Sequence, residues 1–216
     1  MSWATGVAVD FDPTTAEIDS VLDLSTKSVN DPIIIGIKCL NVQNLDTYSF
    51  DLSFNPASLE FTGGYKSLPM PPITNFMESN GGELIEASFG LKGSSIDTVN
   101  VAFSLTGSDS STAPDGNGVI ALASFKILTI QTNWLKLHNV EFLDYAHDIL
   151  TVDSAANGKL EAQVTAIRHL ASGFEHGASF QNRASCTLLG RMLVSPGATA
   201  NQIVIQDRIR TLGFKP

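Results

Sequence analysis

The sequence has 216 residues, of which 43% are hydrophobic and 16% charged, with a mean hydropathy of +0.11. This length fits one domain, or one domain with an appendage, and the composition excludes wholesale disorder, which needs low hydrophobicity and high charge. No apolar run approaches the ~18 residues of a membrane span. We expect no signal peptide, and two cysteines are too few for a disulfide-dense scaffold.

Charge is divided unevenly along the chain. Residues 1–165 hold 7 lysines, no arginine and 20 acidic residues, a net charge of −13, whereas residues 166–216 hold 6 basic and 2 acidic residues, a net charge of +4. The acidic part argues against a nucleic-acid partner, because phosphates need a basic face. The basic part is expected to meet an acidic surface, on its own body or on a neighbouring subunit.

Most of residues 1–165 alternate apolar and polar side chains in short segments bounded by Gly, Pro, Asn and Asp. A period of two over several such segments predicts an antiparallel sandwich or barrel whose strands each have one solvated face. In the last segment the pattern does not decide which face is buried. The segments are Val7–Phe11, Ile33–Leu40, Phe50–Asn55, Val99–Thr106, Val119–Leu128 and Leu135–Phe142.

Four other parts of residues 1–172 do not show this alternating pattern. Lys66–Gly82 contains three prolines and Thr106–Gly118 is rich in Ser, Asp, Gly and Thr, so both are predicted to be long loops that are functional or mobile. Thr14–Leu24 has a poor pattern that fits at most a short turn. Glu161–Ser172 fits a short helix ended by glycine, although a strand over Lys159–Thr165 competes for the same residues.

The C-terminal residues 166–216 form a basic extension of different composition. Cys186–Val194 is apolar enough for a strand, and Gln202–Thr211 places three isoleucines on one face and arginines on the other. The extension therefore predicts a strand hairpin, a short helix or both. Fifty-one residues make a small folding unit, so we expect it to dock on its own body or on a neighbouring subunit.

Several stretches resemble the cohesin domain family. Tyr48–Phe61, YSFDLSFNPASLEF, is similar to the cohesin segment in which an aromatic-x-Pro turn follows an alternating strand and a Leu-Glu-Phe-like stretch starts the next. Thr98–Leu105 (TVNVAFSL), a Gly/Ser/Asp loop and Gly118–Ile127 (GVIALASFKI) follow the family order of strand, loop and long strand. Leu135–Leu143 and Gly158–Val164 resemble the last two strands, so the resemblance covers about residues 5–165.

The resemblance implies both a fold and a class of function. Cohesins are nine-stranded jelly-roll β-sandwiches, so we expect an all-β jelly-roll sandwich of about nine strands over residues 1–165, followed by the extension 166–216. Cohesins are not enzymes; they bind a calcium-loaded helical partner, the dockerin, and hold extracellular enzymes on scaffolds or cell surfaces. The resemblance therefore predicts a non-catalytic protein–protein interaction module that is extracellular or at the cell surface.

One strand carries the partner contacts that the resemblance implies. In the family, outward residues of the strand before the aromatic-x-Pro turn contact the partner, and here Phe50, Leu52 and Phe54 point inward. The candidate partner-binding residues are therefore Thr47, Ser49, Asp51 and Ser53. Ser49 stands where the family often has Asp, which puts ordinary dockerin recognition in question. A row of Ser, Thr and Asp is also what any solvated strand displays.

No metal site is predicted from the sequence. Asp153–Leu160 resembles the start of a calcium loop, but it lacks the second oxygen ligand, and Val164 stands where a bidentate acid is needed. A glycine turn between two strands is favoured, with calcium as the alternative. His138 and His147 flank Asp144, a set of residue types that zinc uses, but strand alternation does not bring them together.

Nothing in the sequence marks a catalytic centre. It contains no nucleophile elbow, no phosphate-binding glycine loop and no acid pair that stands out, so we predict no enzyme and no cofactor. Cys39 alternates with inward isoleucines and is predicted to be a buried thiol, with a bridge to Cys186 disfavoured. Trp134, Tyr145 and Tyr65 are candidates for a sugar-stacking platform, although core packing is the stronger interpretation of the aromatic residues.

Two alternatives of other functional classes remain open. The first is a structural subunit of a self-assembling surface filament or layer, in which the basic extension adds to the sheet edge of a neighbouring subunit. Its candidate subunit contacts are Arg191, Arg208, Arg210 and Lys215. The second is a carbohydrate-binding accessory module, for which polysaccharide would be the partner.

Overall fold

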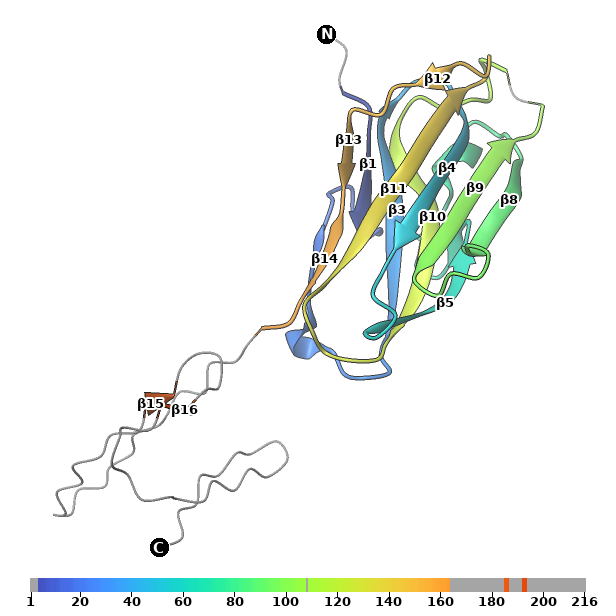
Figure 1. The fold of residues 1–216 in the computed structure, drawn as a ribbon. Coiled ribbons are helices and arrows are strands. Elements are labelled where there is room, and N and C mark those ends of the chain that lie inside the picture. The colour runs from blue at the N-terminus through green and yellow to red at the C-terminus, as the bar shows by residue number, and fades with distance from the viewer. Residues whose placement is uncertain (1–3, 108, 164–184, 187–191, 194–216) are drawn as a thin grey trace, which may run out of the picture. The chain divides into compact units, whose positions relative to one another are not determined.

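The computed structural model describes residues 4–107, 109–163, 185–186 and 192–193 (Figure 1). Two 3-10 turns, η1 (Leu24–Thr26) and η2 (Phe76–Glu78), are the only helical elements of this described part. The strands are β1 (Gly6–Asp10), β2 (Val21–Asp23), β3 (Pro32–Val42), β4 (Leu45–Ser53), β5 (Leu59–Tyr65), β6 (Leu68–Pro69), β7 (Pro72–Ile73), β8 (Leu84–Leu91), β9 (Thr98–Leu105), β10 (Gly116–Ile127), β11 (Asn133–Asp144), β12 (Ile149–Leu150), β13 (Ser154–Ala156), β14 (Gly158–Glu161), β15 (Ser185–Cys186) and β16 (Met192–Leu193).

The chain divides into two units, residues 1–163 and 164–216, and the first is a sandwich of two sheets. One sheet has five strands in the order β13-β1-β3-β10-β5; the other has seven, in the order β2-β14-β11-β4-β9-β8 with β12 paired to β11. Nine strands of this unit have four or more residues. The expectation of an all-β sandwich of about nine strands is therefore confirmed.

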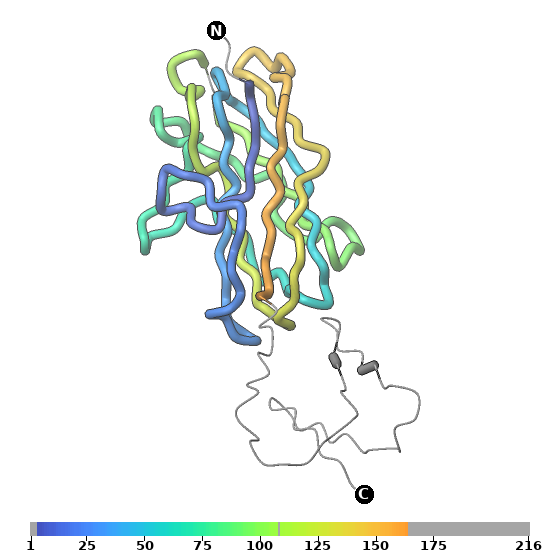
Figure 2. The backbone as a smooth tube through the Cα atoms, turned by 90° about the vertical axis from the view of Figure 1, so that its left-hand side faces the viewer, coloured from blue at the N-terminus to red at the C-terminus, as the bar shows by residue number. Residues whose placement is uncertain are grey.

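Two of the strand pairs are parallel, which the expectation of an antiparallel sandwich did not include. β13 runs parallel to β1 in the five-stranded sheet, and β14 runs parallel to β2 in the other. Only Asn157 separates β13 from β14, so the chain crosses from one sheet to the other at this residue. Figure 2 shows this late segment, in orange, running beside β1.

The core lies between the two sheets and is filled by the inward side chains of alternating strands. Along β9 the residues are alternately buried and partly exposed, as the sequence pattern predicts. Tyr48 stacks on Phe50 and on Phe103, and Phe54 meets Phe125 edge to face. Such pairs add to the free energy gained by burying the rings. The largest fully buried aromatic residues are Tyr48, Phe50, Phe103, Phe125 and Phe142.

An irregularity in β11 explains why its sequence pattern was ambiguous. Leu135 and Leu137 are buried at odd positions, but farther along it is Phe142, at an even position, that is fully buried. The register of β11 on β4 shifts between His138 and Glu141, and Asn139 has a positive φ of 49°. An extra residue of this kind reverses which side chains face the core.

Several strands were not predicted from the sequence, among them the short strands β12 and β13. β8 was not predicted because its pairing with β9 shifts register between Glu86 and Ser88, which breaks the period of two in LIEASFGL. β2 has only three residues inside the segment predicted as a short turn. The predicted loop Lys66–Gly82 instead contains the hairpin β6–β7 and the turn η2.

The predictions beyond residue 158 are tested only in part. Glu161, the first residue of the helix predicted over Glu161–Ser172, ends strand β14, and most of that helix lies outside the described residues. β14 begins the competing strand predicted over Lys159–Thr165 but stops at Glu161. In the second unit β15 pairs antiparallel with β16, two short strands that overlap the strand predicted over Cys186–Val194. The domain boundary at residue 165 stays a prediction.

Candidate docking face

The outer face of the five-stranded sheet is covered by two segments of the chain. The first, residues 12–20, crosses β3. The ring of Pro13 lies against Gly36, where a side-chain Cβ would come within 2.6 Å of the proline Cβ. The Lys38 ammonium is nearly buried under the same segment and donates to the carbonyl oxygens of Thr15 and Glu17, each at 2.7 Å.

The second covering segment, residues 66–83, crosses β10. Leu68 and Ile73 of its hairpin form a small apolar cluster with Val119 and Leu122 of β10. The segment is also fixed by the buried amide of Asn75. This amide donates to the carbonyl oxygen of Ile120 at 2.6 Å and to that of Lys66 at 3.1 Å, while its oxygen accepts from the backbone of Met77.

The outer face of the seven-stranded sheet has no such cover among the described residues. β11, β4, β9 and β8 lie side by side at the front of Figure 1. We call the outward positions of these four strands the bare face. Opposite one another in register are Thr47 with Ser104 and Leu143, Ser49 with Ala102 and Glu141, Asp51 with Asn100 and His138, and Ser53 with Thr98 and Lys136.

The four predicted partner-binding residues do lie together on this face, but Asp51 differs from the others. Thr47, Ser49 and Ser53 are partly exposed, whereas Asp51 is only 4% exposed. The reason is a set of three donors that close over its carboxylate. Lys92 Nζ lies 2.6 Å and Asn139 Nδ2 2.7 Å from Oδ2, and Asn100 Nδ2 lies 3.0 Å from Oδ1.

The surroundings of Asp51 lower the pKa of its carboxyl group. Burial raises the pKa of the carboxyl, but the hydrogen bonds from Lys92, Asn100 and Asn139 and the lysine charge outweigh it, so the pKa is lowered below 3.8. Asp51 is therefore an ionised anchor under the bare face. Its carboxylate holds Lys92, the residue after β8, close to Asn100 of β9 and to Asn139 in the irregular part of β11. Sequence reasoning missed Lys92, Asn100 and Asn139 because the three lie on different strands and turns.

The bare face carries one serine–histidine contact. Ser53 Oγ lies 2.9 Å from His138 Nε2, a distance at which a base can activate a nucleophile. Both residues stand on a flat sheet surface, however, and the carboxylate nearest in register, Asp51, is engaged by its three donors. A triad needs its acid on the histidine. The described contacts therefore support a surface hydrogen bond rather than a hydrolytic centre.

Large apolar side chains lie at the margins of the bare face rather than at its centre. Its central positions are occupied by small residues such as Ser49, Ala102 and Ser88. Ile85, on the edge strand β8, is 53% exposed, and Leu91 and Ile96, beside the β8–β9 turn, are 46% and 69% exposed. A partner that fits this face would meet a polar centre with apolar contacts along the β8 side.

The residues considered for metal binding are not brought together. Asp153 accepts from the backbone of Thr5, and Asn157 accepts from that of Leu137, so both side chains tie strands together. Asp144 accepts from the backbone of its own turn. In the part of the chain that the structure describes, no three His, Cys, Asp or Glu side chains form a group that would hold an ion.

Cys39 is fully buried between the sheets, as predicted, and its thiol is free. Burial raises the pKa of the thiol to about 12, and the thiol lies 3.5 Å from the carbonyl oxygen of Gly118, to which it donates. A thiol of this pKa is protonated at neutral pH and is a poor nucleophile. It packs as a small apolar side chain.

The three aromatic residues considered for sugar stacking are exposed but separate. Trp134 is 46% exposed on β11, with the Lys159 ammonium 6.0 Å from the centre of its ring. Tyr145 lies in the turn after β11, and Tyr65 ends β5 in the other sheet. They do not form one platform. The predicted subunit contacts Arg191, Arg208, Arg210 and Lys215 lie outside the described residues.

Comparison with solved structures shows which known fold the sandwich resembles. No family model and no curated protein match the sequence. Among solved structures, the chain is similar to a non-cellulosomal cohesin from the archaeon Archaeoglobus fulgidus, with 14% identity over 74% of this chain and 92% of that chain and a TM-score of 0.51.

Two bacterial structures are similar to the same extent. One is a type II cohesin domain from the cellulosome of Acetivibrio cellulolyticus, with 14% identity, a TM-score of 0.51 and coverage of 73% of this chain and 95% of that one. The other is a type I cohesin–dockerin complex from Clostridium thermocellum, with 11% identity, a TM-score of 0.53 and coverage of 74% and 94%. The sandwich therefore has a cohesin-like fold. No helix of the described residues is long and apolar enough to cross a membrane.

Proposed function

We propose that the chain is a non-catalytic protein-binding module of cohesin type that docks its partner on the bare face. The observation that carries the proposal is the contrast between the two sheets. The outer face of one is closed by segments of the chain, while the other presents four adjacent strands with small polar side chains. A flat face of this kind suits a protein surface better than a small molecule, which prefers a concave site.

The expected partner is a small folded domain, with a dockerin-like protein as the first candidate. Solved structures similar to this chain include cohesins in complex with dockerins. Because cohesins of this kind work on extracellular scaffolds, the proposal includes a place outside the cell or at its surface. Ser49 lies at the centre of the bare face and opposite Ala102, so a bulky side chain at this position is expected to obstruct a docked partner.

Binding of the full chain to a panel of calcium-loaded dockerins, measured by surface plasmon resonance, tests the proposal. Ser49→Arg places a long charged side chain on the bare face and is expected to weaken a detected interaction at least tenfold. The matched control is Ser67→Arg, because Ser67 is exposed on the segment that covers the other sheet. The control is expected to bind like the wild type.

Two results would contradict the proposal. Equal loss of binding in both variants would place the contact elsewhere or indicate a folding defect, which thermal unfolding of each variant separates. Binding that Ser49→Arg leaves unchanged would remove the bare face as the docking surface. If no dockerin binds, the same pair of variants is applied to any partner captured by the full chain.

Polysaccharide binding is the second candidate, and the exposed ring of Trp134 favours it. The indole and the nearby Lys159 would offer one stacking surface and one hydrogen-bond donor to a sugar. Sedimentation with insoluble polysaccharide measures this directly. Retention of the wild type but not of Trp134→Ala would support it, and equal retention of both would count against it.

A further inference from the structure

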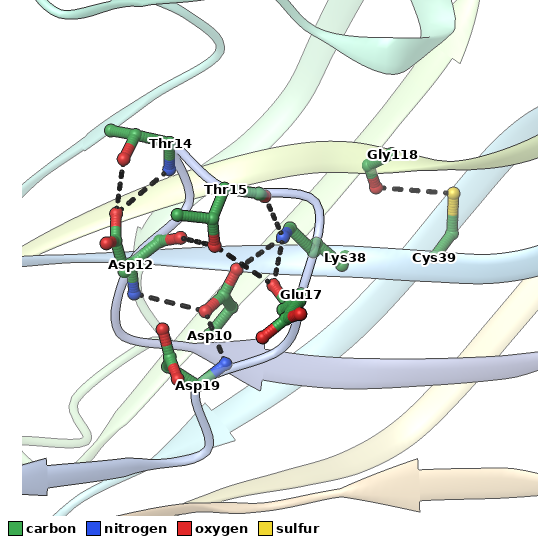
Figure 3. Close-up of polar contacts among 9 residues, drawn as sticks. All are labelled: Asp10, Asp12, Thr14, Thr15, Glu17, Asp19, Lys38, Cys39 and Gly118. Atoms are coloured by element: carbon green, nitrogen blue, oxygen red, sulfur yellow. Dashed lines mark hydrogen bonds and ion pairs between the residues drawn. The ribbon is translucent and has the colours of Figure 1, made fainter.

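The least accessible charged pair of the described residues lies under the first covering segment. Lys38 Nζ of β3 is 2.6 Å from Asp10 Oδ2 of β1, and the two side chains are 7% and 0% exposed (Figure 3). The two side chains are therefore held in direct contact and shielded from water.

The surroundings of the pair hold each reacting atom in a defined place. Two hydrogens of Lys38 Nζ are taken by the carbonyl oxygens of Thr15 and Glu17, each at 2.7 Å, which leaves the remaining position on the nitrogen for the side of Asp10. Asp10 Oδ1 accepts from the backbone N–H groups of Asp12 at 3.0 Å and Asp19 at 2.9 Å. Figure 3 shows these contacts converging on the two side chains.

The second carboxylate oxygen of Asp10, Oδ2, differs from the other buried polar side-chain atoms of the described residues. Oδ2 of Asp10 is buried and makes no directed hydrogen bond, even though the lysine nitrogen lies 2.6 Å away. Among the described side chains it is the only buried nitrogen or oxygen atom in this condition. The partner of this oxygen is therefore the charge of the Lys38 ammonium alone, with no hydrogen bond from another group holding it in place. The loss of Oδ2 in a reaction with Lys38 would cost no hydrogen bond to any other group.

We propose that Lys38 and Asp10 condense to form an isopeptide bond between β3 and β1. A proton first passes from the Lys38 ammonium to Asp10 Oδ2, giving an amine and a carboxylic acid. The amine nitrogen attacks Asp10 Cγ, and the negative charge that develops on Oδ1 is held by the N–H groups of Asp12 and Asp19, as in an oxyanion hole. The Cγ–Oδ2 bond then breaks.

The atoms of this step balance without a cofactor. Oδ2 leaves as water, carrying its own proton and one from the lysine nitrogen, and an ammonium and a carboxylate become one amide and one water. Nothing is oxidised or reduced. The fold supplies the proximity, since reacting groups held in contact react far faster than free ones. The product joins residues 10 and 38 by a covalent bond across two neighbouring strands.

Intact mass spectrometry of the denatured full chain tests the proposal. The wild type is expected to be about 18 Da lighter than its sequence requires, the mass of one water. Lys38→Met and Asp10→Ala are expected to have the full masses of their sequences, and they also fix the reference for any processing of the N-terminus. Asp10→Asn is expected to lose about 17 Da, because its amide would release ammonia in place of water.

Tryptic mapping identifies the bond. Trypsin does not cleave after a lysine whose nitrogen is in an amide, so the peptide Met1–Lys27 should appear joined to Ser28–Lys66. An unshifted mass after several days in neutral buffer would overturn the proposal and leave an ion pair only. A loss of water with the two peptides separate would overturn it as well, because a succinimide, for example at Asp115–Gly116, gives the same mass change.

Discussion

The two outer faces of the sandwich are built on opposite plans. On the five-stranded sheet the chain covers its own strands, and the covering segments are held by buried polar groups, Lys38 in one case and Asn75 in the other. On the seven-stranded sheet one buried carboxylate, Asp51, orders the surface without covering it. Buried polar networks thus stabilise one face of this molecule and arrange the other for contact.

The largest effect on stability is expected when the buried cation of the covered, five-stranded sheet, Lys38, is removed. Lys38→Met leaves Asp10 buried as an uncompensated charge, so we expect its free energy of unfolding to be about 3–5 kcal/mol below that of a wild type in which the two side chains are still an ion pair. The double variant Asp10→Asn/Lys38→Met, which removes both charges, is expected to recover most of this difference but none of the stability that a covalent Lys38–Asp10 bond would add. Urea denaturation measures both. A loss below about 1 kcal/mol in the single variant would show that the pair contributes little.

The second covering segment is tested at Asn75. Asn75→Ala leaves the carbonyl oxygen of Lys66 and the N–H of Met77 without this partner and removes one of the two donors to the Ile120 oxygen, so we expect a loss of about 2–3 kcal/mol. Tyr48→Phe is the milder comparison, because it removes one hydroxyl that donates to the same Ile120 oxygen. Hydrogen exchange of residues 66–83 should rise sharply in Asn75→Ala and little in Tyr48→Phe. If residues 66–83 exchange as slowly in Asn75→Ala as in the wild type, apolar contacts alone hold the segment.

On the bare face, replacing the buried carboxylate of Asp51 should lower the stability by an amount that depends on pH. Asp51 has a lowered pKa in the folded chain, so its contribution is present above the ordinary carboxyl value of 3.8 and is lost as the pH falls through the lower folded value. We expect Asp51→Asn to be about 1–3 kcal/mol less stable than the wild type at pH 6, with the difference shrinking as the pH falls below 3.8. Thermal unfolding across this range checks the prediction; a difference that does not depend on pH would contradict it.

The smallest and most condition-dependent effect is expected from the basic extension, whose role as a subunit contact stays a prediction. If it associates with the acidic body of another copy, light scattering after size-exclusion chromatography should show species larger than the monomer at low salt. Salt should disperse them, because exposed charges are screened. Arg208→Glu/Arg210→Glu should remain monomeric throughout. A wild type that is monomeric at all salt concentrations would end the self-assembly alternative.

The fold was predictable because several of its strands follow a period of two, most regularly β9. β10 was found as a long apolar run although its pairing shifts register, and the resemblance over Tyr48–Phe61 indicated how the turn after β4 is made. Prediction failed where the pairing is irregular, in β8 and in the middle of β11, since an extra residue moves later side chains to the other face. The structure of the covering segment 66–83 was missed because its prolines suggested a loop, and its contacts with β10 depend on the tertiary fold.

The candidate site was predictable to the level of one strand. Alternation along β4 placed Thr47, Ser49 and Ser53 on a common surface, but it gave no sign that Asp51 is buried there. Its donors come from Lys92, Asn100 and Asn139, which no periodic pattern connects. The Asp10–Lys38 pair was equally hidden, because its neighbours Thr15, Glu17 and Asp19 belong to the segment Thr14–Leu24, whose pattern is poor. Contacts between strands depend on register, which a single sequence does not report.

The parallel pairing of β1 with β13 and of β2 with β14 has a mechanical consequence. Parallel neighbours begin at the same end, so Thr5, just before β1, and Glu161, at the end of β14, lie at opposite ends of the sandwich. Tension applied between these two residues would slide the strands along one another and load their hydrogen bonds together. A sheet pulled in that direction resists far more than one whose bonds open one after another.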